Sequence, residues 1–305
     1  MRYNISTSNT NPVDTFIDFD KVGNLSTPIY GKKEIQIINL SIPSGGVPVL
    51  VWETGKYYMT LSYSSFSVTQ EVSLIDYGEG SSIFEISHLR NMLNAQMASL
   101  VTALESVVMG LPSLDVPQFY FDETTQLWHL TAITSAYNSS LATPIKISVN
   151  SYLFNILQGL PNKYNPTTNL YTFQFDNLRE NVYNSTYTRL IQESISVKNF
   201  AEVQKVYLIT NLPVENEIFS SDNSNTNNWS RNVLANLTVD YSEGLKKFRA
   251  GFNFSAPSQF YRVSLGEINN VYNLGFRVYY ENLNNELKQM RISSNSFCAI
   301  NFEVL

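Results

Sequence analysis

Hydrophobic and polar positions follow two different periods along this chain. Over Glu34–Ile42 and Tyr57–Val68, apolar and polar side chains alternate with the period of two that is typical of β-strands. The period then changes, because apolar residues recur at every third or fourth position, and this predicts one long amphipathic helix over about residues 84–109. A second, short helix is expected at about 151–157.

The sequence carries start and stop signals around the long helix. Ser82 and Glu85 have the spacing of a capping box, and Ser87 is a second candidate for the cap. Gly110 and Pro112 follow the last apolar position, where residues of these types end helices.

The remainder of the chain reads as short strands separated by turn residues. We expect them at Gln118–Phe121, Gln126–Ile133, Ile145–Val149, 170–175, 187–196, 203–210, 233–240, 259–265, 274–281 and 296–304. Many short strands with one inserted long helix are typical of an all-β sandwich. Residues 1–33 are rich in Ser, Thr, Asn, Pro and Gly and are predicted as an extended N-terminal arm. Residues 34–305 then form one sandwich domain, with or without a small subsidiary β lobe.

The apolar stripe of the long helix has two interpretations. We favour a helix that covers one end of the β-barrel, because a solitary amphipathic helix must bury one face against the sheets. The alternative places one side of the helix at a boundary between subunits, where Met92, Met97 and Met109 would form an adaptable contact surface.

Composition and charge narrow the class of protein. Hydrophobic residues make up 43% of the 305 positions and aromatic residues 13%, so the chain can bury a large core. The net charge of −6 disfavours an electrostatic grip on nucleic acid, and we expect no direct nucleic-acid binding. Cys298 is the only cysteine, which excludes an intrachain disulfide. No apolar run reaches about eighteen residues, so no transmembrane segment is predicted.

Candidate reactive residues are few and scattered. His88 and His129 lack neighbours at metal-ligand spacing, and we interpret both as structural. Cys298 lies between apolar residues and is expected to be buried. The acidic pairs at Asp122-Glu123 and 215–217 could serve glycoside cleavage only if they faced each other across a cleft, and solvated loop carboxylates are the simpler interpretation. We predict no catalytic, cofactor or metal site, and no enzyme activity.

Three consecutive segments carry an ordered set of motifs. The long helix has an Asn-Ala pair, a Pro-x-Phe strand follows, then an Asp-containing turn runs into a Leu-rich strand, and an Asn-x-x-Leu-Phe helix leads into a Pro. The positions are Asn94, Ala95, Pro117, Phe119, Asp122, Thr125, Leu127, Leu130, Asn150, Leu153, Phe154 and Pro161. Further pieces at 206–217, 261–265 and 275–279 follow in the same order.

This order resembles the penton proteins, the single jelly-roll minor capsid proteins of virophages and polinton-like viruses. The likeness covers about residues 80–305, and the Mavirus-type virophage pentons are the members it resembles most in length. Gly159-Leu160 stands where an aromatic pattern is usual, and 282–285 replaces an acidic-Gly turn. The resemblance implies that the twelve motif positions have structural roles.

The resemblance implies a single jelly roll that assembles as a homopentamer at the fivefold vertices of an icosahedral DNA-virus particle. It also implies contact with a double-jelly-roll major capsid protein, a location at the capsid vertex of the virion, and synthesis in the host cytoplasm. The alternative from another class is a lectin-like β-sandwich that binds a receptor or carbohydrate, with Trp52 and Trp229 on loops stacking on sugars. A third and weaker hypothesis is an enzyme that cleaves glycosides.

Overall fold

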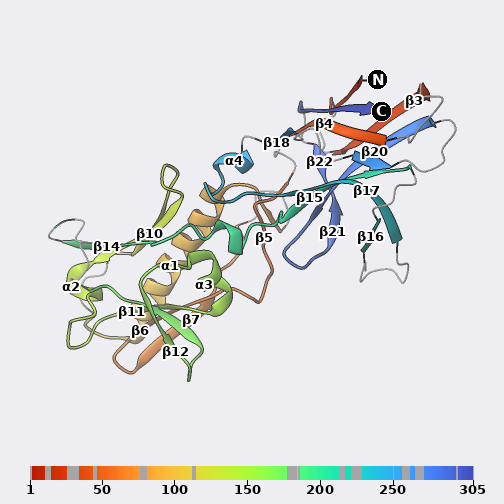
Figure 1. Ribbon diagram of the computed structural model, residues 1–305. Helices are drawn as coiled ribbons and strands as arrows, with labels where there is room; N and C mark the ends of the chain where they lie inside the picture. Colours follow the sequence, from red (N-terminus) through yellow and green to blue (C-terminus); the bar gives the residue numbers. More distant parts are fainter. Residues whose placement is uncertain are drawn as a thin grey trace. The chain divides into compact units, whose positions relative to one another are not determined.

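The computed structural model describes residues 2–10, 15–25, 34–43, 47–75, 81–111, 115–176, 184, 186–212, 217–220, 229–249, 251–255, 262–264, 271–292 and 295–304 (Figure 1). The chain divides into two compact units. Unit 1 is Met1–Pro48, Ala201–Tyr241 and Leu245–Leu305, and unit 2 is Val49–Phe200 with Ser242–Gly244. The sequence predicts one domain over 34–305, with or without a small subsidiary β lobe, and the structure places Val49–Phe200 in a compact unit of its own.

Unit 1 is built from two antiparallel sheets. The first has the order β1-β23-β4-β18, with β19 also paired to β4. Its strands are β1 (Arg2–Ser8), β23 (Phe297–Val304), β4 (Glu34–Ile42), β18 (Phe252–Ser255) and β19 (Arg262–Ser264). The second has the order β16-β17-β15-β20-β21, with β3 also paired to β20. Its strands are β16 (Glu217–Ser220), β17 (Trp229–Thr238), β15 (Lys205–Thr210), β20 (Val271–Glu281), β21 (Leu287–Gln289) and β3 (Asp18–Leu25).

The two sheets of unit 1 bury their facing sides against each other. Strand β23 alternates buried and more exposed residues, as a half-buried strand does. Its Phe302 meets Phe276 of β20 edge to face, with ring centroids 5.1 Å apart, and also stacks on Tyr3. Two smaller elements complete the unit: the pair β2 (Thr15–Phe16) with β22 (Arg291–Ile292), and helix α4 (Lys246–Arg249). The predicted β-sandwich is confirmed.

Part of the predicted N-terminal arm belongs to these sheets. Strand β1 pairs with β23 along its whole length, from Arg2 opposite Glu303 to Ser8 opposite Phe297, and β3 pairs with β20. No residue of β1 is fully buried, which explains why its sequence shows no apolar alternation. Residues 11–14 and 26–33 of the arm lie outside the described residues.

Unit 2 contains the long helix α1 (Ile86–Val107). A five-stranded sheet has the order β12 (Asn162–Asn165), β13 (Leu170–Phe173), β11 (Lys146–Val149), β6 (Tyr58–Tyr63) and β7 (Phe66–Glu71). A three-stranded sheet has the order β14 (Tyr187–Ile191), β10 (Leu127–Ile133) and β9 (Gln118–Asp122). The remaining elements are the pair β5 (Leu50–Val51) with β8 (Ser82–Ile83), helices α2 (Thr134–Tyr137) and α3 (Ser151–Leu157), and the 3₁₀ turn η1 (Val197–Asn199).

Helix α1 lies at the centre of unit 2. It contacts β6 and β7 of the five-stranded sheet and β9 of the three-stranded sheet (Figure 1). Leu89, Leu93 and Leu100 on its inner face are fully buried, and so are Met92 and Met97. The expectation of a helix covering a barrel end is therefore wrong, because α1 forms the core of a separate unit. Of the three methionines that were expected at a subunit boundary if the alternative held, Met109 is exposed and the other two are buried.

Local signals at the helix ends were partly misleading. The N-cap is Glu85, and it makes no side-chain capping bond. Ser82 instead pairs with Val51 in the short β5–β8 ladder, so the predicted capping box is wrong. Ser87 lies within the first turn and donates to the Glu85 carboxylate. Gly110 has a φ of +79°, which suits its place after the helix; Pro112 lies outside the described residues.

Most predicted strands are confirmed, with their ends shifted by a few residues. The span Tyr57–Val68 differs, because it is a hairpin of β6 and β7 and not one strand. Ser64 in its turn has a φ of +54°, which reverses the chain.

Candidate functional site

The motif residues all lie in unit 2, and Asn94 shows what they do there. Its side-chain Nδ2 donates to the Phe119 carbonyl at 3.0 Å, and its Oδ1 accepts from the Phe119 N–H at 2.7 Å. The amide therefore pairs with β9 as a neighbouring strand would, and it fixes helix α1 to the sheet. Ala95 is exposed beside it.

Asn150 holds a second junction. Its Oδ1 accepts from the backbone N–H of Leu153, which caps helix α3, and from the N–H of Tyr58 at 3.2 Å. Its Nδ2 donates to the carbonyl of Lys56 at 2.6 Å. One side chain thus provides hydrogen-bond partners for backbone groups at the start of α3 and at the start of β6.

Asp122 closes the turn between β9 and β10. Its Oδ1 accepts from the Thr124 N–H at 2.8 Å. This bond, followed by one from the Thr125 side chain, holds the pKa of the Asp122 carboxyl below its ordinary value. The carboxylate is therefore engaged in turn formation.

The apolar motif residues form core contacts of unit 2. Pro117, Phe119, Leu130 and Leu153 are buried, whereas Leu127 and Pro161 are half-buried. Phe154 stacks on Tyr171 with ring centroids 3.9 Å apart.

The two histidines and the cysteine are buried. His88 Nε2 lies 2.7 Å from the Ile75 carbonyl, which is a structural hydrogen bond. His129 has no hydrogen-bond partner on either ring nitrogen among the described residues, and burial, with the nearby Arg189 charge, lowers its pKa. Burial raises the pKa of the Cys298 thiol to about 12, so the thiol stays protonated and unreactive at neutral pH.

Neither a cluster of metal ligands nor a membrane-spanning helix is found among the residues that the structure describes. No group of three or more His, Cys, Asp or Glu side chains there could hold a metal ion. No helix among those residues is long and apolar enough to cross a membrane. Of the acidic pairs, 215–216 lies outside the described residues.

Trp52 does not present its ring to a ligand. Only 2% of the residue is exposed, and its ring stacks on Tyr57 with centroids 3.8 Å apart. The expectation that Trp52 stacks on sugars is therefore wrong, and the side chain of Trp229 lies outside the described residues. Large apolar side chains that are exposed include Phe16, Phe66, Tyr120, Tyr152, Tyr164 and Phe297.

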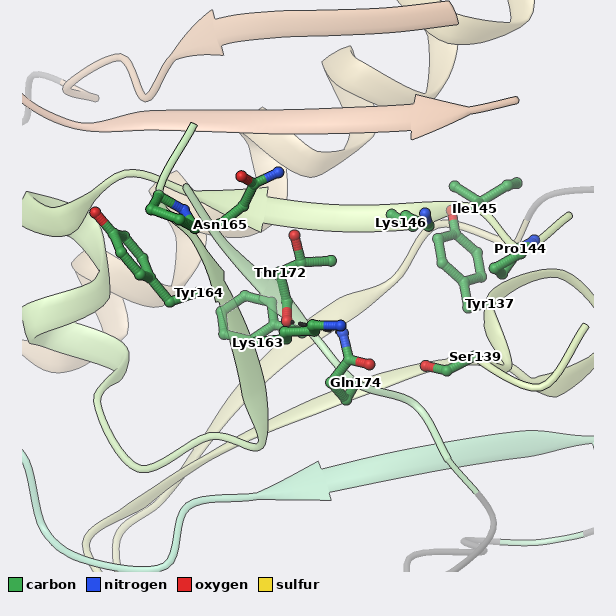
Figure 2. Close-up of a pocket in the computed structure, with 12 residues that line it drawn as sticks. Tyr137, Ser139, Pro144, Ile145, Lys146, Lys163, Tyr164, Asn165, Thr172 and Gln174 are labelled. Carbon is green, nitrogen blue, oxygen red and sulfur yellow. Dashed lines mark hydrogen bonds between the residues drawn. The ribbon is translucent and has the colours of Figure 1, made fainter. Parts of the chain in front are cut away.

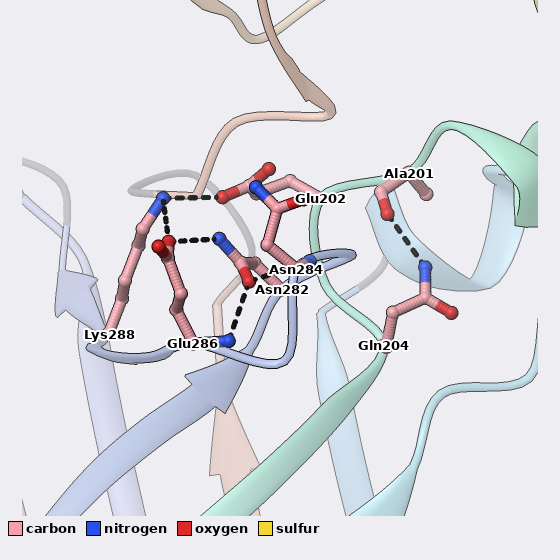
Figure 3. Close-up of polar contacts among 7 residues, drawn as sticks. All are labelled: Ala201, Glu202, Gln204, Asn282, Asn284, Glu286 and Lys288. Carbon is pink, nitrogen blue, oxygen red and sulfur yellow. Dashed lines mark hydrogen bonds and ion pairs between the residues drawn. The ribbon is translucent and has the colours of Figure 1, made fainter. Parts of the chain in front are cut away.

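Two features have no signal in the sequence. One is a pocket of about 450 Å³ in unit 2, formed by the segments around α2, β11, β12 and β13 (Figure 2). The other is a polar cluster in unit 1, where Lys288 Nζ lies 2.9 Å from a carboxylate oxygen of the buried Glu202 (Figure 3). Asn282 in that cluster bonds Glu286 through its side-chain amide, and its backbone N–H donates to the Glu286 carbonyl at 3.0 Å, which closes the β20–β21 hairpin. The cluster joins residues far apart in the sequence, whereas the pocket is formed by neighbouring elements within residues 137–174.

The chain has a jelly-roll β-sandwich fold, and two solved virophage structures share it. The chain is similar to a chain of the Sputnik virophage, whose structure was determined by cryo-EM at 3.5 Å resolution, with a TM-score of 0.79 and 19% sequence identity. That likeness covers 100% of this chain and 97% of the other. The crystal structure of the selenomethionine-labelled Mavirus penton protein matches with a TM-score of 0.72 and 11% identity, over 99% of this chain and 98% of that one.

Sequence comparison adds nothing to these structural matches. No protein-family model matches the chain, and no curated protein matches it significantly. The jelly-roll fold expected from the sequence is thus confirmed by structure alone.

Proposed function

We propose that this chain is a structural capsid protein that forms homopentameric capsomers at the fivefold vertices of an icosahedral DNA-virus particle. The observation that carries the proposal is the extent of the structural match. A β-sandwich alone serves many functions. Here the match to a virophage chain covers 100% of this chain, so both units have counterparts in it.

The interior chemistry supports a scaffold and not an enzyme. Asn94, Asn150 and Asp122 satisfy backbone groups at junctions and turns. His129 and Cys298 are buried, and burial disfavours the charged form of each. Side chains engaged in this way hold a shape, which is what a capsid subunit requires.

We assign formation of the shell to unit 1. It contains the two facing sheets, and unit 2 is inserted between its strands β4 and β15. A ring of five requires two different complementary faces on each copy, and closure of the ring leaves neither face open. In this proposal the pentamer also contacts a double-jelly-roll major capsid protein, and the chain is made in the host cytoplasm and resides in the virion.

Native mass tests the assembly. Each chain has a mass of 34.6 kDa, so a ring of five has a mass of about 173 kDa. Light scattering or native mass spectrometry of the purified chain, alone and mixed with the major capsid protein, should detect that species. A stable dimer or trimer, or a monomer that persists in both samples, contradicts the proposal.

The lectin-like alternative has less support than the capsid role. It relied on loop tryptophans, and Trp52 is buried against Tyr57. A stable monomer that binds glycans and ignores the major capsid protein would favour that alternative.

A further inference from the structure

The pocket in unit 2 has the size of a small-molecule site. Its volume is about 450 Å³, within the range of roughly 300–1,000 Å³ that is common for ligand pockets. Figure 2 shows Tyr164 and Asn165 at one end and Ser139, Pro144 and Lys146 at the other, with Thr172 and Gln174 between them. All lining residues belong to unit 2, so the pocket depends on one folded unit only.

The charge of this pocket is opposite to that of the chain. Lys146 and Lys163 line it and no Asp or Glu does, although the chain as a whole has a net charge of −6. Neither lysine makes an ion pair with any described residue. A neighbouring hollow is lined by Asp176 and Glu193 and is therefore acidic. The lysine pocket thus favours a negatively charged ligand.

Polar groups along the middle of the pocket retain hydrogen-bonding capacity. Gln174 uses its Nε2 to bond the Thr172 carbonyl, which leaves its Oε1 as an acceptor. Asn165 uses its Oδ1 to bond the Thr167 N–H, which leaves its Nδ2 as a donor. With the Ser139 hydroxyl, these groups suit a ligand that carries several hydroxyls.

The aromatic ring of Tyr164 packs away from the two lysines. Tyr164 is 44% exposed, its hydroxyl donates to Asn169 at 2.9 Å, and its ring packs on Tyr171 at 4.8 Å between centroids. Because successive residues of a strand point to opposite faces of the sheet, this ring lies on the face of β12 opposite to Lys163 and Asn165 and does not contribute to their binding surface. Tyr137 forms part of the wall, and its buried hydroxyl has no partner among the described residues.

We propose that this pocket binds a saccharide that carries an anionic group, a carboxylate or a sulfate. Lys146 and Lys163 supply the positive charge, and Gln174 and Asn165 bond the hydroxyls. The site gives a capsid subunit an attachment function. Binding at a single unit 2 does not require the ring of five, so it can be tested apart from assembly.

Titration of the full chain with four probes tests the class of ligand. The probes are N-acetylneuraminic acid, a sulfated heparin disaccharide, the neutral sugar N-acetylglucosamine and inorganic sulfate, measured by calorimetry or saturation-transfer NMR at low salt. We expect at least one acidic sugar to bind tenfold or more tightly than both the neutral sugar and sulfate. Equal binding of acidic and neutral sugars, equal binding of sulfate, or no binding of either acidic sugar at millimolar concentration overturns the proposal.

Substitutions locate the binding. The double variant Lys146→Gln with Lys163→Gln should weaken binding of the acidic sugar tenfold or more. Lys198→Gln is the matched control, because Lys198 is an exposed lysine of unit 2 that does not line the pocket. The control should bind as the unsubstituted chain does. Unchanged binding by the double lysine variant, or an equal loss in the Lys198 variant, places the ligand elsewhere and overturns the proposal.

Discussion

At the scale of single residues, two asparagine side chains replace backbone hydrogen-bonding groups in unit 2. Asn94 pairs with both backbone groups of Phe119, and Asn150 bonds backbone groups of Lys56, Tyr58 and Leu153. Backbone groups removed from water need such partners, because each unsatisfied one costs free energy. The two side chains therefore bind together elements that have no ladder between them.

The substitution Asn94→Ala should lower the free energy of unfolding of unit 2 by about 2–3 kcal/mol, because it leaves the N–H and carbonyl of Phe119 unpaired. Asn91→Ala is the control, since Asn91 is exposed on the same helix and should change stability by about 0.5 kcal/mol or less. Urea unfolding measures both. Equal effects of the two substitutions would show that the pairing with Phe119 contributes nothing.

A carboxyl group in unit 1 should make stability depend on pH. Glu281 accepts hydrogen bonds from Lys205 Nζ at 2.9 Å and from the Tyr207 hydroxyl at 2.6 Å. Burial acts to raise the pKa of Glu281, but these bonds and the Lys205 charge together outweigh it and hold the pKa below its ordinary value. The carboxylate therefore stabilises the folded state above the unfolded pKa, about 4.3, and this stabilisation is lost as pH falls through the folded pKa.

We expect Glu281→Gln to flatten the acid limb of the stability profile. Urea unfolding between about pH 7 and pH 3 should show the unsubstituted chain losing more stability below about pH 4.3 than the variant does. Above that pH the difference between the two should be constant. Parallel profiles over the whole range would contradict the assignment.

At the scale of elements, the apolar stripe of α1 was readable from sequence and its packing was not. The predicted span of about 84–109 contains the observed helix Ile86–Val107. A stripe shows only that one face is buried, and the sheets that bury it come from segments before and after the helix. For the same reason the contacts of Asn94 with Phe119, 25 positions away, could not be inferred from the motif itself.

Strands with few apolar residues escaped prediction. All residues of β12 (Asn162–Asn165) are exposed, and β1 has no fully buried position. Alternation identifies a strand only where one face enters a core. These edge strands pair through the backbone, which any sequence can do.

The end of helix α3 offers a test of close packing. Gly159 has a φ of +95°, and a Cβ there would lie 3.3 Å from the Ser194 carbonyl oxygen. Gly110 has a φ of +79° with nothing within 4 Å of such a Cβ. Both Ala substitutions meet the left-handed backbone penalty of about 1–2 kcal/mol. Gly159→Ala should lower the free energy of unfolding by about 1 kcal/mol more than Gly110→Ala does, because the Ser194 backbone must move. Thermal or urea unfolding measures both variants.

The Gly110 variant is the internal control for that comparison. Equal losses in the two glycine variants would mean that the backbone around Ser194 moves without cost. A smaller loss at Gly159 than at Gly110 would contradict the packing described at this turn.

At the scale of the whole molecule, the chain combines a jelly-roll unit with a helix-centred unit inserted into it. The strand signals and the ordered motifs were enough to predict the jelly roll and the inserted helix. The second core was not predictable, because it requires knowledge of which strands pair around α1. The pocket was not predictable either, because Lys146 and Lys163 come together only through the sheet order β12-β13-β11.

The capsid role makes a prediction at the level of the particle. Cryo-EM of purified particles of the virus that encodes this chain measures it most directly. We predict density at every fivefold vertex that fits five copies of this fold, with unit 1 in the shell and each copy contacting its neighbours through two different faces. Vertex density that fits another protein, or particles that lack this chain, would contradict the assignment of this protein as the vertex capsomer.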